Sequence, residues 1–452
     1  MTKQIFKQRG QNATRSAAAN VFSLCFPLFL VDAVRRAHPM ASRRFHLLPP
    51  ESADLAPGLL EDDPRVVVAS AWIDLTDGPV VAHLPHSRGR RLDLTLIDAA
   101  GEPFASLGTR TGDDEGVDVA VAGPHWSGEI PRGGLARRAP SDGCWAVGRI
   151  HAHSPADRGE AEAVAANLRI SAAGRRPDRQ AGAPPQLAPP AVSCLRQTIE
   201  LEPALFFHRL DAVLDRAPVG FERATRPLLD QFRRDLGGPP PAADWSSNLA
   251  EALALGFADG LAAIRAAAAA LCEGRGVGWH AVAVPAPDDS GASLAQAGRV
   301  YSGLGAPARE ELLTLVCEHD GRGRPLRGDR RSRLRFPAGA LPPADGSWRL
   351  CTRPAGATGR GQGVGGRDVL TLDPDGALDL IIHDRPPPAP ANWLAAPGDA
   401  MSLVMRLYAP QGAALCGAWR MPPVEIADLD ADGAGPSGEP SESHQPNRRT
   451  PP

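Results

Sequence analysis

Runs of residues that alternate between apolar and polar constrain this chain more than any other feature, because only a strand gives side chains a period of two. They occur in two separate regions of the 452 residues, at 66–150 and at 311–410. In the last run, Arg406 stands between Met405 and Leu407, whose side chains fall on the opposite face. Gly, Pro, Asp and Ser clusters separate the runs, which predicts largely antiparallel sheets.

The stretch between the two β-regions has the composition of a linker followed by helices. Residues 172–193 are rich in Pro and Gly and have no apolar periodicity. Residues 194–275 contain three segments with helical character, the longest of them rich in Ala and Leu. The predicted organisation is a flexible N-terminus (1–16), a first β-domain (17–171), the linker (172–193), a helical connector (194–275), a second β-domain (276–426) and a disordered tail (427–452).

An apolar segment at 17–31, AAANVFSLCFPLFLV, follows several basic residues and so has the layout of a secretion signal. Asp32, Arg35 and Arg36 follow it at once, it is shorter than a membrane span, and Pro27 interrupts it. We therefore predict a kinked, buried amphipathic helix, no transmembrane segment and a cytoplasmic protein. The alternative is export, with residues 1–31 acting as the signal.

Composition excludes several classes of function. The formal net charge is -3, from 49 basic and 52 acidic residues, so no overall field favours nucleic acid or an anionic membrane. Lysine occurs only as Lys3 and Lys7, which rules out a phosphate-binding loop and a catalytic lysine in the folded body. The seven cysteines never form a Cys-x-x-Cys pair, so we expect reduced thiols and neither a disulfide framework nor a zinc site.

Three motifs suggest a cofactor or a metal, but their contexts argue against each. The string 361–366 fits a dinucleotide-binding loop, yet a strand pattern follows it where that loop needs a helix. Residues 428–439 have the spacing of a calcium loop but contain Pro436 and precede no helix. His151 and His153 share a strand face, but no third ligand is near in sequence. We therefore predict neither a cofactor nor a metal.

The C-terminal stretch 391–424 resembles the signature of bacterial proteins that pair two domains of unknown function, numbered 1254 and 1214. The residues that carry the resemblance there are Asn392, Trp393, Leu394, Pro397, Arg406, Leu407, Tyr408, Pro410, Trp419, Pro422 and Pro423. The positions that match the first domain are Phe26, Pro27, Leu28, Asp32, Ala71, Trp72, Asp74, Leu75, Asp98, Phe104, the run 108–112, Gly123, Pro124, Trp126 and Gly128. The resemblance implies a mainly β chain with a helical insert: two antiparallel, jelly-roll-like β-sandwich domains joined by a helical connector.

One part of the first-domain pattern is absent. The family has a polar cluster before its second strand, where this chain reads Asp63, Arg65, Val66, Val68 and Ala69. A run such as VVVA has to pack on both faces of a sheet. We predict that the valines 66, 67 and 68 are buried and that they fill any pocket that relatives have at this place.

For function the sequence supports two hypotheses of different class. The first is a non-catalytic protein that binds a small polar ligand, such as a saccharide, in an interdomain cleft. Its candidate ligand-binding residues are Asp98, Arg110, Arg149, Trp393 and Arg406, because charges in apolar contexts are costly unless they are paired. The other role for these arginines is an internal ion pair with Asp98, Asp74 or Asp157. The second hypothesis is a hydrolase-like enzyme in which Asp98 acts with His151 or His153.

Overall fold

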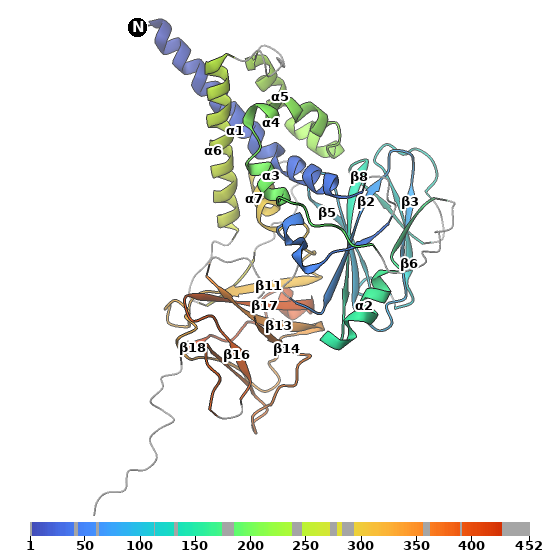
Figure 1. Cartoon of the computed structure of the whole chain (residues 1–452), viewed down its shortest axis with the longest axis vertical. Helices are drawn as coiled ribbons and strands as arrows, with labels where there is room; N and C mark the ends of the chain where they lie inside the picture. Colours follow the sequence, from blue (N-terminus) through green and yellow to red (C-terminus); the bar gives the residue numbers. More distant parts are fainter. Residues whose placement is uncertain are drawn as a thin grey trace, which may run out of the picture.

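The structure is a computed structural model that describes residues 2–39, 44–59, 63–112, 114–130, 134–173, 185–236, 246–271, 278–282, 293–355, 362–388 and 391–426. It has two sheet-rich domains with a group of helices packed on the first (Figure 1). The predicted calcium-loop string at 428–439 lies outside the described residues.

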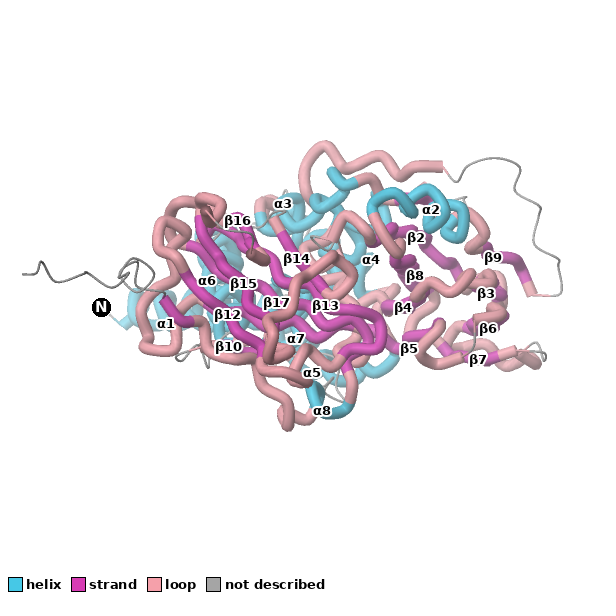
Figure 2. The backbone as a smooth tube through the Cα atoms, turned by 90° about the horizontal axis from the view of Figure 1, so that it is seen from below, coloured by secondary structure: helices cyan, strands magenta, loops and turns pink. Residues whose placement is uncertain are grey.

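Two sheets form the first domain, and their strands are mostly antiparallel. One has the order β1-β2-β8-β4-β5 and the other the order β7-β6-β3-β9. The strands are β1 (His46–Leu47), β2 (Val66–Asp74), β3 (Val80–Leu84), β4 (Leu92–Ile97), β5 (Pro103–Gly108), β6 (Val117–Ala122), β7 (Leu135–Arg138), β8 (Gly143–His151) and β9 (Arg169–Ala172). Helix α2 (Arg158–Ala165) packs on β2 and β8 (Figure 2).

Strand β2 shows why the first sheet is covered on both faces. Val66 and Val68 join the apolar core beneath the helices, whereas Val67 joins the core between the two sheets. The exposed fraction is 7% for Val66, 1% for Val67 and 4% for Val68. The predicted burial of the three valines is confirmed, and its cause is the period of two in a strand with packing on each side.

Helix α1 (Thr2–Ala37) is the centre of the helical group. It packs against α3 (Cys194–Ile199), α4 (Pro203–Leu214), α5 (Val219–Leu236), α6 (Ser247–Ala270) and α7 (Leu294–Gly303). The approach of α6 is close enough to require glycine: a Cβ on Gly256 would lie 2.6 Å from the carbonyl oxygen of Arg15. A Cβ on Gly260 would lie 2.7 Å from that of Ala19.

The N-terminus differs from the sequence-based expectation in two ways. Residues 2–16, expected to be flexible, are helical and continue α1, and Arg15 Nη2 donates to Asp259 of α6 at 2.8 Å. The helix is also not amphipathic where it is apolar, since nearly every residue from Val21 to Val34 is buried. Neighbouring helices and the sheet surround this part of α1, so it has no solvent-facing side.

By length and composition, two of the described helices could cross a membrane, namely Gln11–Ala37 and α6. The same properties belong to core helices and, near an N-terminus, to signal sequences. In the first of them 78% of the apolar window is buried inside the fold, as in a core helix.

The second domain also consists of two mostly antiparallel sheets, with orders β10-β11-β17-β13-β14 and β16-β15-β12-β18. Its elements are β10 (Trp279–Ala281), β11 (Leu312–Cys317), β12 (Ser332–Phe336), β13 (Ala344–Pro354), β14 (Gly363–Gly365), β15 (Leu378–His383), β16 (Trp393–Ala395), β17 (Met401–Pro410), α8 (Gly412–Leu415) and β18 (Glu425–Ile426). Strand β14 falls within the Gly-rich string and pairs with β13. The chain is thus sheet-rich with two domains, while jelly-roll topology stays a prediction.

A buried carboxylate joins the two domains. Glu311, only 2% exposed, accepts hydrogen bonds from Arg91, from Arg110 Nε at 2.6 Å and from Ser106 Oγ at 3.0 Å. All three partners belong to the first domain, whereas Glu311 directly precedes β11 of the second. An ion pair this well enclosed fixes the relative position of the domains, because separating them would leave its charges without partners.

A second polar network lies beside it, at the segment where the family's polar cluster is replaced. Asp63 accepts from Arg65 Nε at 3.0 Å, and Arg349 of β13 approaches the same carboxylate at 4.0 Å. Burial acts to raise the pKa of Asp63, but the hydrogen bond and charge of Arg65 outweigh it and hold that pKa below its ordinary value. Tyr408 Oη lies 3.5 Å from the carboxylate. Polar character therefore persists at 63 and 65, where it is used at the domain interface.

We expect Glu311→Ala to lower the free energy of unfolding by about 3–5 kcal/mol, because it leaves buried Arg91 without its carboxylate. Urea unfolding followed by circular dichroism measures the change. The matched control is Glu310→Ala, an exposed neighbour whose replacement should change stability by no more than about 0.5 kcal/mol. Equal stability of the two variants would show that the interface ion pair does not hold the domains together.

Candidate functional site

A cavity of about 350 Å³ lies between the helices and the first sheet. Helix α1 provides one wall, strand β2 and the start of β8 provide another, and the end of α4 closes it. The lining residues are Leu28, Val31, Asp32, Arg35, Trp72, Asp74, Thr76, Ala99, Asp142, Gly143, Val213, Asp215 and Arg216. This combination of an apolar floor, one aromatic side chain and several polar groups is typical of a small-molecule site.

Trp72 is the aromatic side chain of the cavity. In β2 it follows Val66 and Val68 at the period of two, so its side chain lies on the face toward α1 and packs against the helical core. The half-buried indole lies against the bare backbone of Gly143, where a Cβ would come within 2.9 Å of Trp72 Cζ2. No acceptor for Trp72 Nε1 lies among the described residues, so this N–H is available to a ligand.

Three carboxylates line the same cavity from separate segments: Asp74 at the end of β2, Asp142 before β8, and Asp215 at the end of α4. Within the part of the chain that the structure describes, no arginine, lysine or histidine lies within 4.0 Å of any of them. The Asp74 carboxylate accepts from the Thr76 hydroxyl at 2.6 Å. Asp215 caps the C-terminus of α4, where the helix dipole disfavours a negative charge. These carboxylates therefore remain available as strong hydrogen-bond acceptors in the cavity.

The basic residues of the cavity are held on its α1 wall by Asp32. This carboxylate, 7% exposed, accepts from Arg35 at 2.8 Å and from Arg209 at 3.0 Å, and Arg36 and Arg216 also lie within 4.0 Å. One carboxylate among four guanidinium groups leaves this wall net positive. The cavity thus has guanidinium donors on its α1 wall, the carboxylates of Asp74 and Asp142 on the sheet side, and Asp215 at the end of α4.

The structure places the sequence-predicted site residues apart from one another. Arg110 binds Glu311, and Arg149, fully buried, donates to the carbonyl oxygens of Gly305 and Leu59 and lies 3.7 Å from Asp93. Their partners are therefore none of the three aspartates expected from the sequence. Arg110 joins the two domains through Glu311, and Arg149 joins the first domain to the segment at Gly305 that leads into the second. Both arginines therefore have a structural role at the interface.

The two predicted residues of the second domain lie elsewhere. Arg406 is buried on β17, opposite Thr314 and Arg349 on the neighbouring strands. Trp393 lies on β16 of the other sheet, and its Nε1 donates to the carbonyl oxygen of His383 at 3.0 Å. Neither of these residues, and neither interface arginine, lines the cavity around Trp72.

Asp98 does not line the cavity either, although the next residue, Ala99, does. Its Oδ1 accepts from the backbone N–H groups of Ala100 and Glu102 at 2.9 and 3.0 Å. Burial raises the pKa of Asp98 to about 7, against the lowering effect of these hydrogen bonds. Asp98 therefore shapes the turn between β4 and β5 with a carboxyl group that titrates near neutrality.

The expected partnership of Asp98 with a histidine is not formed. In the register of β4 and β8, Ile97 is opposite Trp145, whereas Leu92 is opposite Ile150. Asp98 and His151 therefore lie at opposite ends of the strand pair, about 20 Å apart at the rise of a strand. This exceeds the reach of general acid–base catalysis, so the pairing on which the hydrolase hypothesis rested is wrong. His151 contacts Asp93 and Tyr408 instead.

Sequence reasoning missed the cavity because its residues come from five separate segments of the chain. A signal was nevertheless present: Leu28, Asp32, Trp72 and Asp74 are among the residues that carry the family resemblance, and all four line the cavity. Asp142 and Asp215 had no such signal, since they stand in turns without a recognisable motif.

Comparisons with known proteins agree with this architecture. Two family models match the chain, each described as a protein of unknown function: DUF1254 at residues 47–172 and DUF1214 at residues 311–412. The chain therefore belongs to the proteins that carry these two domains in this order. None of the curated proteins matches it.

Two solved structures are similar to the chain. The VPA0106 protein from Vibrio parahaemolyticus has 18% sequence identity and a TM-score of 0.61, covering 92% of this chain and 100% of that one. An uncharacterised protein from Burkholderia cenocepacia has 11% identity and a TM-score of 0.43, covering 94% and 95%. The first likeness shows that the fold is shared over most of the chain.

The raised pKa of Asp98 has a testable consequence for stability. Since the native pKa is about 7 and the ordinary value is 3.8, Asp98 contributes stability that is fully present below about pH 4 and is lost as the pH rises through 7. Asp98→Asn keeps an oxygen acceptor for the turn and removes the titration. Its stability relative to the native protein should therefore rise by about 2–3 kcal/mol between pH 5 and pH 8.

Urea unfolding at the two pH values measures this difference. The control is Asp77→Asn, which changes an exposed turn carboxyl and should show no such dependence. A pH-independent difference between native protein and Asp98→Asn would contradict the assignment.

Proposed function

We propose that the protein binds a small polar ligand of the saccharide type in the cavity between α1 and the first sheet. The observation that carries the proposal is the half-buried Trp72, whose indole N–H has no acceptor among the described residues, set among three carboxylates without cationic partners there. The proposal keeps the ligand class expected from the sequence and moves its site from the domain interface to this cavity.

The chemistry of the cavity suits a polyhydroxylated ligand. Sugar hydroxyls are donors for Asp74, Asp142 and Asp215 and acceptors for Arg35 and the Trp72 N–H. The apolar face of a sugar ring can pack on the indole, which offers a large rigid surface at little cost in conformational entropy. The volume of about 350 Å³ lies within the range of small-molecule sites.

Helix α1 also supports a cytoplasmic location over export through a cleaved signal. Removing residues 1–31 would take Phe22 and Phe26 from the core and Leu28 from the cavity wall. Mass spectrometry of the protein from its own cells should therefore find α1 intact. A mature chain beginning near residue 32 would contradict this part of the proposal.

A thermal-shift and calorimetric screen against neutral mono- and disaccharides tests the proposal. A binding saccharide should stabilise the native protein by about 2.7 kcal/mol at one hundred times its Kd. Asp142→Asn, which preserves size, should weaken binding by about tenfold, the effect of losing about 1.4 kcal/mol. Trp72→Ala should abolish the measurable heat.

Asp211→Asn is the matched control, because Asp211 is exposed on α4 but does not line the cavity. Its affinity should equal that of the native protein. The proposal fails if no saccharide stabilises the native protein at millimolar concentration, or if Asp142→Asn and Asp211→Asn bind equally well.

A further inference from the structure

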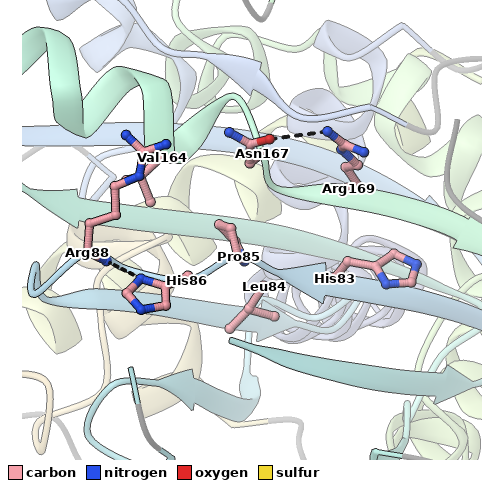
Figure 3. A pocket seen from close by; sticks show the side chains of 8 residues that line it. All are labelled: His83, Leu84, Pro85, His86, Arg88, Val164, Asn167 and Arg169. Atoms are coloured by element: carbon pink, nitrogen blue, oxygen red, sulfur yellow. Dashed lines mark hydrogen bonds between the residues drawn. The ribbon is translucent and has the colours of Figure 1, made fainter. Parts of the chain in front are cut away.

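A second cavity, of about 360 Å³, is lined by residues of the first domain (Figure 3). Strand β3 and the turn after it form one side, and the end of α2 with the start of β9 forms the other. Leu84, Pro85 and Val164 give it an apolar floor. It shares no lining residue with the Trp72 cavity, so a ligand bound here is independent of the proposed function.

The rim of this cavity is basic. His83 and Arg169 lie opposite each other in the register of β3 and β9, and the turn adds His86 and Arg88. Figure 3 shows the Arg88 side chain extending from the turn toward the side on which Val164, Asn167 and Arg169 lie. The groups that can carry positive charge thus come from both sides of the cavity.

Nearby carboxylates occupy three of these four groups. His83 Nδ1 is 2.7 Å from Asp118, Arg88 Nη1 donates to Glu160 at 3.1 Å, and His86 Nε2 is 3.8 Å from Asp114. The Glu160 pair is well exposed, with 61% of the acidic side chain accessible, and such pairs contribute little to stability. Arg88 can therefore exchange Glu160 for a ligand at small cost.

Arg169 has no carboxylate partner among the described residues. In those ranges no acidic group lies within 4.0 Å of it, and its one side-chain hydrogen bond goes from Nη2 to the Asn167 amide oxygen at 3.1 Å. Its Nε is buried and has no acceptor among the residues that the structure describes. A guanidinium group with unused, partly desolvated donors at a cavity is suited to bind an oxyanion in a bidentate manner.

The backbone at Arg88 is strained in a way that favours this use. Arg88 has φ 56°, in the left-handed region that suits glycine, and the turn is held by hydrogen bonds from Arg88 N to His86 Nδ1 and from Gly89 N to Asp114. A non-glycine residue in this conformation is unfavourable, and such strain concentrates at functional positions. Position 88 thus carries a guanidinium group at the cavity, although glycine would adopt this backbone conformation at lower free energy.

We propose that this cavity binds a small molecule through an oxyanion, a phosphate or a carboxylate, held by Arg169 and Arg88 over the Pro85 floor. The Asn167 amide orients Arg169, and Nε2 of His86 adds a donor at the rim, whereas both ring nitrogens of His83 are engaged by Asp118 and Ser171. Guanidinium groups bind phosphate and carboxylate in the same geometry, so the proposal names an oxyanion in general. The test uses one ligand of each kind to distinguish the two.

Isothermal titration calorimetry with inorganic phosphate, with succinate and with uncharged erythritol tests the proposal on the full chain. At least one of the two anions should bind at millimolar concentration in a manner that depends on Arg169, whereas any heat with erythritol should not depend on Arg169. Arg169→Gln should weaken that binding at least tenfold. Arg137→Gln, which changes a half-buried arginine on β7 outside the cavity, should leave it unchanged.

Arg88→Gly provides a second variant that keeps the fold. It should weaken anion binding severalfold while raising the unfolding midpoint, because glycine adopts φ 56° without strain. Absence of binding by both anions, or an Arg169→Gln variant that binds as tightly as the native protein, would overturn the proposal. So would an Arg88→Gly variant with undiminished affinity.

Discussion

The apolar part of α1 has to be covered on every side, because nearly all of its residues from Val21 to Val34 are buried. A helix that is apolar all round is stable only inside a protein core or a membrane. Here the covering comes from one face of the first sheet and from helices that lie far along the chain from α1. This requirement brings α4 beside β2 and so creates the cavity around Trp72.

Arginine, together with buried acids, fixes the second domain on this assembly. Glu311 accepts hydrogen bonds from Arg91 and Arg110 of the first domain. The backbone carbonyl of Gly305 accepts from Arg149 of the same domain. The planar guanidinium suits such buried contacts because it forms several directed hydrogen bonds and always carries its charge. These three arginines are therefore engaged within the protein, and both of the ligand sites that we propose lie at other places, in cavities at the first domain.

Local patterns in the sequence predicted those features of the fold that depend on residues close together in the chain. The strands of both domains follow from a period of two, and the burial of Val66, Val67 and Val68 follows from a run that must pack on both faces. The helical state of residues 2–16 depends instead on α6, which runs alongside this part of α1. No local pattern indicates that contact.

The candidate site depends even more on contacts between segments that are distant in the sequence, which local patterns do not indicate. Arg110 pairs with a residue 201 positions away, and Asp142 and Asp215 reach the cavity from unrelated turns. Spacing in the sequence carries no information on such convergence. Only Leu28, Asp32, Trp72 and Asp74 could be selected beforehand, through the family resemblance, and nothing in that resemblance showed that they share a cavity.

A crystal structure of the protein soaked with its best-stabilising saccharide tests the central claim most directly. The account predicts electron density for one sugar ring stacked on the Trp72 indole, with hydroxyls within hydrogen-bonding distance of Asp142 and of at least one other cavity carboxylate. Density for the sugar at the interface of the two domains, with the Trp72 cavity holding only water, would contradict it.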